Sequence, residues 1–231
     1  MRYTWVLFDA DDTLFDYGKA EAAALRKTFE VAGLGFEAPY LEVYHTINQR
    51  LWQDFELGKI PREVLRTRRF ALLFEAIGVA TDPVRFAEAY VQYLAEGGDL
   101  MVGAAETVAA LYGKVGLVLI TNGLTLVQRS RLARSEIAPY FTDVVISEEV
   151  DAMKPDRAIF DAAFARMGHP EKAEVLIVGD SLTSDIKGGS DYGIDTCWFN
   201  PAGSPCDPDV RISYEIAALR DVLPIVGLSW S

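Results

Sequence analysis

The chain has 231 residues, of which 50% are hydrophobic, and carries a formal net charge of −12 from 22 basic and 34 acidic side chains. A chain of this length can build one large domain or a domain with an insertion. The acidic balance argues against a nucleic-acid polymer as partner, because phosphate backbones are bound by clustered lysine and arginine. It does not exclude a small phosphorylated ligand, provided that positive charge is concentrated at one site.

The cysteine content and the absence of targeting segments favour a cytoplasmic protein. Cys197 and Cys206 are too few for a disulfide framework and indicate a reducing cytosol. We interpret them as buried or unreactive thiols, since no second cysteine pair or histidine cluster accompanies them. The N-terminal stretch MRYTWVLFDADD lacks the apolar run of a signal peptide, and no stretch approaches the ~20 apolar residues of a membrane span.

Five short runs along the chain have the composition of β-strands. Most are continuously apolar rather than alternating, which is typical of strands covered on both faces of a parallel sheet. The runs are 3–9, 115–121, 143–147, 175–180 and 195–199. Helical patterns separate the last four, at about 124–136, 155–167 and 184–192. This alternation predicts an α/β fold with a Rossmann-like, doubly wound parallel sheet.

The segment between the first two strand runs has helical periodicity and no strand-like run. Helical patterns cover 19–33, 38–58, 61–78 and 82–98. Expected C-terminal caps are Gly33, Gly58, Gly78 and Gly97, and expected first-turn prolines are Pro61 and Pro83. We therefore expect a bundle of four helices over 17–95, inserted into an α/β domain formed by 1–16 and 96–231. A helix near 103–112 leads back to the second strand, and ISYEIAALRDVLPIV adds a short strand and a helix.

Polar side chains gather where the predicted strands end. They are Asp9 and Asp11 after the first strand, Thr121 and Asn122 after the second, Lys154 before a proline-started helix, and Asp180 and Asp185 after the fourth strand. Ligands of open α/β sheets bind at the carboxyl ends of the strands. If these strands are neighbours, the groups converge on one crevice.

Each of these residue types has a chemical task in such a crevice. A carboxylate can attack a phosphorus atom and form an acyl phosphate. A second carboxyl two positions on can protonate the leaving oxygen and later deprotonate water. Hard oxygen ligands suit Mg²⁺, which would offset the repulsion between crowded carboxylates. A lysine, a hydroxyl and the N–H groups of the helix start after Thr121 can hold the phosphate oxygens.

The motifs together resemble those of the haloacid dehalogenase superfamily. They are D-x-D-x-T in FDADDTLFD, a strand that ends in Thr in LITNG, a following lysine, and G-D-x-x-x-x-D in VGDSLTSD. The resemblance covers essentially the whole chain. It implies Asp9 as nucleophile and Asp11 as general acid/base. It also implies that Thr121 and Lys154 bind phosphate, with Asn122 lining the site. The same resemblance implies Mg²⁺ held by Asp180, Asp9 and the backbone carbonyl of Asp11, with Asp185 supporting the metal shell. The true dehalogenases of the superfamily do not use this acid/base aspartate, so Asp11 favours phosphoryl chemistry.

The helical insertion resembles the type-one α-helical cap, which closes over the site and supplies substrate contacts. A closer resemblance is to bacterial 5′-nucleotidases with pyrimidine preference. It is carried by FDADDTLFD, LWQDFELGKI, ITNGLTLVQRSRL, VVISEEVDAMKPDRAIFD and TCWFN. It implies a nucleoside 5′-monophosphate as substrate, with phosphoglycolate or a sugar phosphate as the alternative. Trp52 is a candidate platform for a base, with Asn48 beside it, although aromatics at helical spacing usually belong to a core.

Two other interpretations of the acidic cluster are less consistent with the chain. An EF-hand calcium loop requires Gly at its sixth position and Glu at its twelfth, where this chain has Leu14 and Ala20. A phosphorelay receiver is also an α/β domain with clustered acids, a threonine and a lysine. A receiver is much shorter, however, and its phosphorylated aspartate follows a later strand. The oligomeric state and the identity of the base stay open.

Four further polar residues are expected outside the chemistry. Asp12 stands where many relatives have glycine, and we expect Asp12 to stabilise its loop and Asp16 to cap a helix. His45 and His169 are isolated in the sequence. We expect both to be surface or half-buried imidazoles.

Overall fold

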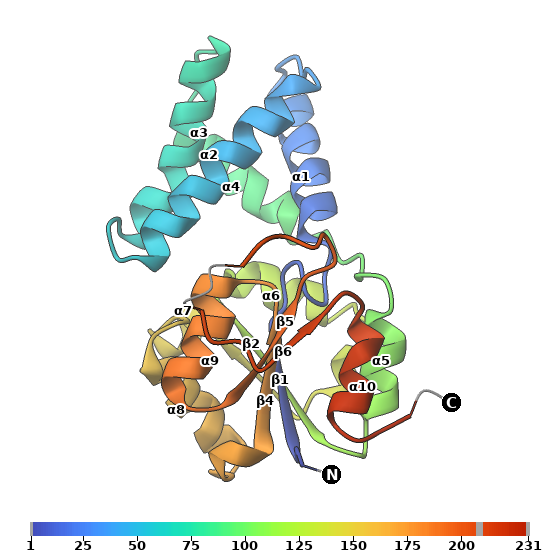
Figure 1. Cartoon of the computed structure of the whole chain (residues 1–231). Helices are drawn as coiled ribbons and strands as arrows, with labels where there is room; N and C mark the ends of the chain where they lie inside the picture. The colour runs from blue at the N-terminus through green and yellow to red at the C-terminus, as the bar shows by residue number, and fades with distance from the viewer. Residues whose placement is uncertain (1, 207–209, 230–231) are drawn as a thin grey trace. The chain divides into compact units, whose positions relative to one another are not determined.

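A computed structural model describes residues 2–206 and 210–229 of the chain. Within these residues, six parallel strands form one sheet in the order β3-β2-β1-β4-β5-β6 (Figure 1). The strands are β1 (Trp5–Phe8), β2 (Gly116–Thr121), β3 (Asp143–Ile146), β4 (Val175–Gly179), β5 (Asp195–Phe199) and β6 (Tyr214–Ile216). The chain thus starts near the centre of the sheet and winds outward in both directions. The predicted doubly wound parallel sheet is confirmed.

Helices cover both faces of this sheet. Val6 and Phe8 of β1 pack in one cluster with residues of α5 (Ala104–Leu111), α6 (Thr125–Leu132) and α10 (Val222–Ile225). Leu7 packs in another cluster with residues of α8 (Arg157–Arg166) and α9 (Lys187–Tyr192). Successive side chains of a strand point to opposite faces. The continuously apolar runs are therefore what a sheet buried on both sides requires.

The ends of the core helices differ from the predicted ranges. The helix expected at about 184–192 begins with a π-helical turn, Leu182–Ile186, before α9 starts. A short helix, α7 (Ser147–Val150), follows β3 and was not predicted, because four residues are too few to show a helical period. Single 3₁₀ turns cover Ala138–Tyr140, Lys172–Glu174 and Leu219–Asp221. None of the helices in the described residues is both long enough and apolar enough to cross a membrane.

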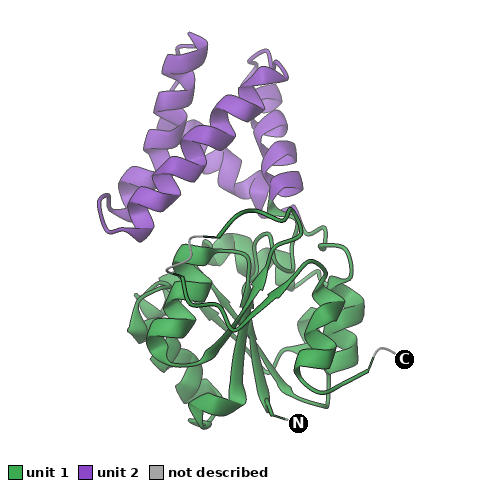
Figure 2. Cartoon of the chain, in the orientation of Figure 1, with its two compact units in different colours: residues 1–17, 98–231 green, residues 18–97 purple. Residues whose placement is uncertain are grey.

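The chain divides into two compact units, shown in different colours in Figure 2: an α/β unit of residues 1–17 and 98–231, and a helical unit of residues 18–97. The helices of the second are α1 (Tyr17–Val31), α2 (Pro39–Glu56), α3 (Arg62–Ile77) and α4 (Pro83–Leu94). Aromatic side chains form its core. Phe70 stacks on Tyr44 with ring centroids 5.4 Å apart, and Phe74 meets Phe86 edge-on at 4.9 Å. The helical unit therefore has a hydrophobic core of its own.

The glycines expected as helix caps serve two different purposes. Gly78 ends α3 in the left-handed conformation, with φ 69°, as predicted. Gly97 does not cap a helix, because α4 ends at Leu94 and Ala95 follows it in the right-handed helical conformation. A Cβ at Gly97 would lie 2.5 Å from the Cβ of Ala20. The prediction that Gly97 caps a helix is therefore wrong. Glycine is needed there because the backbone passes close to Ala20 of α1.

The two cysteines lie in different environments, which predicts different reactivities. Cys197 on β5 is fully buried, and burial raises the pKa of its thiol to about 12, whereas Cys206 is partly exposed. The thiolate is the reactive form. We therefore expect one thiol to react with Ellman's reagent in the folded protein near neutral pH, and both in concentrated guanidinium chloride. Cys206→Ser should abolish the reaction of the folded protein, and a rapid second thiol would contradict the buried position of Cys197.

Candidate active site

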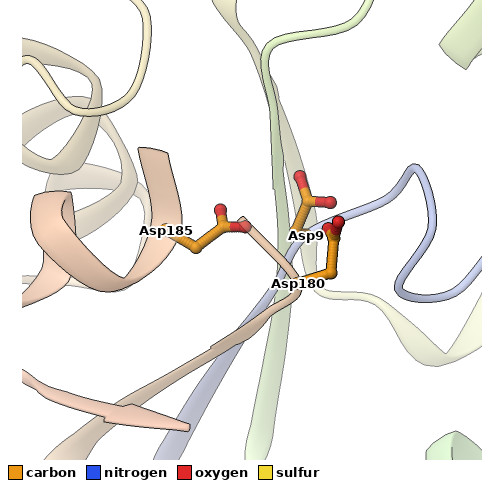
Figure 3. A group of neighbouring side chains, drawn as sticks. All are labelled: Asp9, Asp180 and Asp185. Atoms are coloured by element: carbon orange, nitrogen blue, oxygen red, sulfur yellow. The ribbon is translucent and has the colours of Figure 1, made fainter. Parts of the chain in front are cut away.

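The predicted site residues meet at the carboxyl ends of neighbouring strands. Asp9 directly follows β1, Thr121 ends β2 and Asp180 directly follows β4. β1 lies between β2 and β4, with Phe8 in register with Leu119 and Val178. Figure 3 shows Asp9 and Asp180 at the strand ends, with Asp185 approaching from the helical segment after β4. The site residues were expected to converge only if these strands were neighbours in the sheet, and the strands are neighbours.

Lys154 lies at the centre of this arrangement. Its side chain is 1% exposed, and its ammonium donates to the carboxylate of Asp9, to Asp185 Oδ1 at 2.7 Å and to the carbonyl of Ile120 at 2.9 Å. An ammonium group has three N–H donors, and all three are used here. One buried cation therefore holds two buried carboxylates in place.

The electrostatic balance of the site comes from burial and from crowding. Burial raises the pKa of Asp9 to about 8, against the lowering effect of Lys154, and the neighbouring Asp185 adds to the rise. Burial, together with Asp9 and Asp185, also raises the pKa of Asp180 well above its ordinary value. For Lys154 burial acts to lower the pKa, but Asp185 and Asp9 outweigh it and raise the pKa. The lysine is thus held as a cation beside more negative charge than it can neutralise.

The carboxylates fit a hard divalent cation. Oxygen atoms of Asp9, Asp180 and Asp185 all lie within 4.8 Å of one another. Three carboxylates outnumber the one ammonium beside them, and the raised pKa values of Asp9 and Asp180 show that the negative charges of these two residues are poorly compensated. A small number of carboxylates, completed by water and a substrate phosphate, is the ligand set typical of Mg²⁺. The side chain of Asp11 lies outside this group.

Thr13 holds Asp180 and had no role in the sequence-based expectation. Its hydroxyl accepts from the backbone N–H of Asp180 at 3.1 Å and donates to Asp180 Oδ1 at 3.2 Å. The indole of Trp198 donates to the carbonyl of Asp180 at 2.8 Å. Thr13 is the last residue of the D-x-D-x-T pattern, so the motif did contain a signal for it. Its partner, 167 positions away, could not be identified without the sheet order.

Thr121 and Asn122 shape the loop after β2. The hydroxyl of Thr121 accepts from the N–H of Gly123 at 3.0 Å, which tightens the turn. The side-chain amide of Asn122 donates to the carbonyl of Lys154 and accepts from its N–H, both at 2.8 Å. Ser147, the first residue of α7, donates to the carbonyl of Asn122 at 3.2 Å. The amide of Asn122 is therefore used to hold the backbone of Lys154 in position.

The carboxylate of Asp11 is bound by two residues of α6 that sequence analysis did not single out. Gln128 Nε2 donates to Asp11 Oδ2 at 2.6 Å, and the guanidinium of Arg131 pairs with Asp11 Oδ1. Both side chains are buried. In the sequence they are ordinary polar residues of a short helix, and no local signal distinguishes them from solvated ones.

The backbone conformation at Asp12 explains why an aspartate can stand at this position of the loop. This residue has φ 58°, in the left-handed region, and its N–H donates to the carbonyl of Phe15 at 2.8 Å. Glycine adopts this conformation without cost, and aspartate is among the few other residues that tolerate it. Glycine and aspartate can therefore both adopt the backbone conformation required at this position. Asp16 precedes α1, and its N–H donates to the carbonyl of Asp99 at 2.9 Å.

The candidate specificity residues lie in the helical unit. Asn48 is buried there, and its amide donates to Glu21 Oε1 at 2.8 Å and accepts from Arg69 at 3.0 Å. His45, which is exposed as expected, lies 2.9 Å from the other oxygen of Glu21. Trp52 is half-buried and meets Phe55 edge-on at 5.7 Å. Asn48 thus links two buried charges inside the helical unit.

The family model of haloacid dehalogenase-like hydrolases matches residues 3–193. The chain belongs to the haloacid dehalogenase-like hydrolases. This family membership confirms the predicted superfamily and sets aside the phosphorelay receiver.

Three relatives that match nearly the whole chain support this family assignment. The HAD-hydrolase YfnB of Bacillus subtilis is 38% identical over 98% of this chain and 97% of its own. The crystal structure of YfnB bound to magnesium has a TM-score of 0.95, covering 99% of this hydrolase and 100% of that chain. The pyrimidine 5′-nucleotidase PynA of Streptococcus pneumoniae is 37% identical over 96% of this chain and 94% of its own. The pyrimidine 5′-nucleotidase YjjG of Escherichia coli is 36% identical over 96% and 97%.

Magnesium binding provides a first test of the acidic cluster. We expect Asp180→Asn to weaken Mg²⁺ binding at least about tenfold, because an anionic oxygen is lost. We also expect the wild-type affinity to fall as the pH is lowered through about 8, since protons compete for Asp9, whose pKa burial raises to about 8. Titration calorimetry at a series of pH values measures both effects. Glu106→Gln, an exposed acid on α5, is the control, and equal affinities for Asp180→Asn and wild type would contradict the assignment.

The buried network around Asn48 provides a second test. Asn48→Ala removes a bond from each of two buried charges, Glu21 and Arg69. We expect the free energy of unfolding to fall by about 1–3 kcal/mol, the cost of leaving such groups less satisfied. Urea denaturation measures it. Gln49→Ala, the exposed amide next in the chain, should change stability by no more than about 0.5 kcal/mol, and equal effects of the two substitutions would contradict the network.

Proposed function

We propose that this hydrolase is a Mg²⁺-dependent phosphomonoesterase of the cytoplasm. In this proposal it acts through an aspartyl-phosphate on Asp9, and its preferred substrate is a pyrimidine nucleoside 5′-monophosphate. The observation that carries the proposal is the contact of the buried Lys154 with Asp9 and Asp185, beside Asp180, at the ends of adjacent strands. A nucleophilic carboxylate needs a neighbouring cation both to remain ionised and to approach a phosphate dianion.

The reaction proceeds in two displacements. In the first, a carboxylate oxygen of Asp9 forms a bond to phosphorus while the ester P–O bond breaks, and Asp11 gives its proton to the leaving alkoxide. In the second, a water oxygen attacks phosphorus while the Asp9–phosphorus bond breaks, and the water proton passes to Asp11. The products are the alcohol and inorganic phosphate, and both carboxyl groups return to their starting state.

Charge compensation explains the other residues of the site. Asp9 and Asp180, with Asp185 in support and the backbone carbonyl of Asp11, would hold Mg²⁺, and the bound ion supplies charge neutralisation for the phosphoryl oxygens. Lys154 contacts the carboxylate of Asp9 directly, so its charge lies where the transferred group becomes attached. Thr121 and the N–H groups that follow it would bind phosphate oxygens. Asn122 contributes by holding the backbone of Lys154.

The substrate class rests on the relatives and on the helical unit. Two full-length relatives at 36–37% identity are named pyrimidine 5′-nucleotidases. In this proposal the helical unit acts as a cap that supplies substrate contacts, with the half-buried Trp52 as a stacking surface for the base. Asn48 supports the cap from within, through Glu21 and Arg69.

Phosphate release from a panel of esters tests the activity and the substrate class together. The panel contains pyrimidine and purine nucleoside 5′-monophosphates, phosphoglycolate and a sugar phosphate. We expect the highest kcat/KM with the pyrimidine nucleotides, and loss of release when a chelator removes Mg²⁺. A dominant rate with phosphoglycolate would overturn the substrate class and leave the mechanism intact.

The nucleophile is tested by removing its negative charge while keeping its shape. Asp9→Asn should lower phosphate release by at least about 10³-fold, because an amide cannot form the acyl phosphate. Asp12→Asn makes the same change on the same loop, at an exposed position whose φ of 58° asparagine also tolerates, and should retain most of the activity. Undiminished turnover by Asp9→Asn would contradict the mechanism.

A further inference from the structure

Helix α6 carries two buried polar side chains beside the proposed active site. Gln128 is 0% exposed and Arg131 is 1% exposed, which places a charged group in the interior of the α/β unit. Residues three apart lie on the same side of a helix. Gln128 and Arg131 therefore form one polar stripe on a helix whose other buried residues include Val127 and Leu132.

Both side chains end on the same carboxylate. Gln128 Nε2 binds Oδ2 of Asp11 at 2.6 Å, and Arg131 Nη1 binds Oδ1. The guanidinium of Arg131 also lies 5.3 Å from the centre of the Phe15 ring, within the range of a cation–π attraction. Each oxygen of Asp11 thus has its own donor, and a carboxylate bound at both oxygens cannot rotate freely.

Stability alone does not account for this pair. Among the described residues, Arg131 Nε and Nη2 and Gln128 Oε1 have no hydrogen-bond partner although they are buried. Buried polar groups without partners destabilise a fold, and buried ion pairs are often no more stabilising than apolar side chains of similar volume. Leucine or methionine at these positions would fill the same space without that cost. The arrangement is explained better by what it does to Asp11.

Helix α6, which carries Gln128 and Arg131, is itself held in place by contacts with α7. Glu148 of α7 accepts from the N–H of Thr125, the first residue of α6, at 2.7 Å. Arg129 binds both carboxylate oxygens of Glu149, at 2.8 Å and 2.6 Å. A Cβ at Gly123 would lie 2.1 Å from Gln128 Nε2, so Gln128 reaches Asp11 through space that glycine leaves open. The loop after β2 and the helix that follows it are therefore built around this contact.

We propose that Gln128 and Arg131 are positioning residues that hold the carboxyl group of Asp11 in the orientation required for proton transfer to the leaving alkoxide. The inference rests on the proposed function, in which Asp11 is the general acid of the first displacement. Its distinctive consequence concerns the leaving group. An alkoxide needs a proton as the ester bond breaks, whereas p-nitrophenolate leaves well without one, so misplacing Asp11 slows the two reactions unequally.

The test compares kcat/KM for uridine 5′-monophosphate and p-nitrophenyl phosphate, because this constant covers the steps up to formation of the aspartyl-phosphate. General acid catalysis contributes about 10²–10⁴-fold, so we expect Arg131→Met to lower kcat/KM for the nucleotide by about 10²-fold. We expect less than about a threefold loss with the nitrophenyl ester, and partial recovery of the nucleotide reaction with Arg131→Lys.

Gln128→Leu should show the same asymmetry, with a loss of about tenfold in kcat/KM for the nucleotide. Combined with Asp11→Asn, Arg131→Met should cause no further loss, since both act on one proton transfer.

Controls separate positioning from structure. Arg134→Met removes an exposed arginine three residues further on and should leave both constants near wild type. Circular dichroism establishes folding, and Gln128→Leu carries the test if Arg131→Met does not fold. Equal losses with both esters, a gain in rate, or additive losses with Asp11→Asn would overturn the inference while leaving the phosphatase intact. A wild-type protein that hydrolyses neither ester would overturn the proposed function and this inference with it.

Discussion

The contact of one buried ammonium with two buried carboxylates is the constraint on which the site depends. Lys154 contacts Asp9 and Asp185 at the same time and also donates to the carbonyl of Ile120 on β2. Without this cation two desolvated negative charges would face each other at the ends of β1 and β4. The backbone of Lys154 is fixed in turn by the amide of Asn122. Three separate stretches of the chain must therefore come together before the charge of Asp9 is even partly compensated, and burial still raises its pKa to about 8.

The geometry after β4 shows why the G-D-x-x-x-x-D pattern begins with glycine. A Cβ at Gly179 would lie 2.3 Å from Cγ of Asp185. The π-helical turn Leu182–Ile186 directs Asp185 back over the end of the strand, where its Oδ2 accepts from the N–H of Ser181 at 3.1 Å. Glycine is needed so that this side chain can occupy the space above the strand. The spacing of the pattern thus follows from a close approach between a strand end and the helix turn that comes after it.

The sequence was sufficient for the sheet and for the polar residues that gather at its edge, but not for their tertiary partners. Apolar runs predict strands such as β5 well, because burial on both faces leaves a continuous signal. Gln128 and Arg131 were missed, because a polar residue on a short helix has the same local pattern whether it is solvated or bound to Asp11. The cap expected at Gly97 was wrong because its cause, the approach to Ala20, lies in another helix. Local sequence patterns predict helices and strands, but they do not reveal contacts between distant segments of the chain.

Two carboxylates to which we assign different tasks follow β1 within three residues, and the structure separates them by giving each its own cation. The chain turns immediately after Asp9, where the carbonyl of Ala10 accepts from the N–H groups of Leu14 and Phe15 at 2.9 Å and 2.8 Å. Asp9 contacts Lys154 and belongs to the acidic cluster, while Asp11 contacts Arg131 on α6 and lies outside that cluster. A nucleophile must stay ionised next to other anions, whereas a proton donor must be free to change its charge. Pairing the two carboxylates with cations from different elements lets the negative charge of Asp9 be compensated without tying Asp11 to the same lysine.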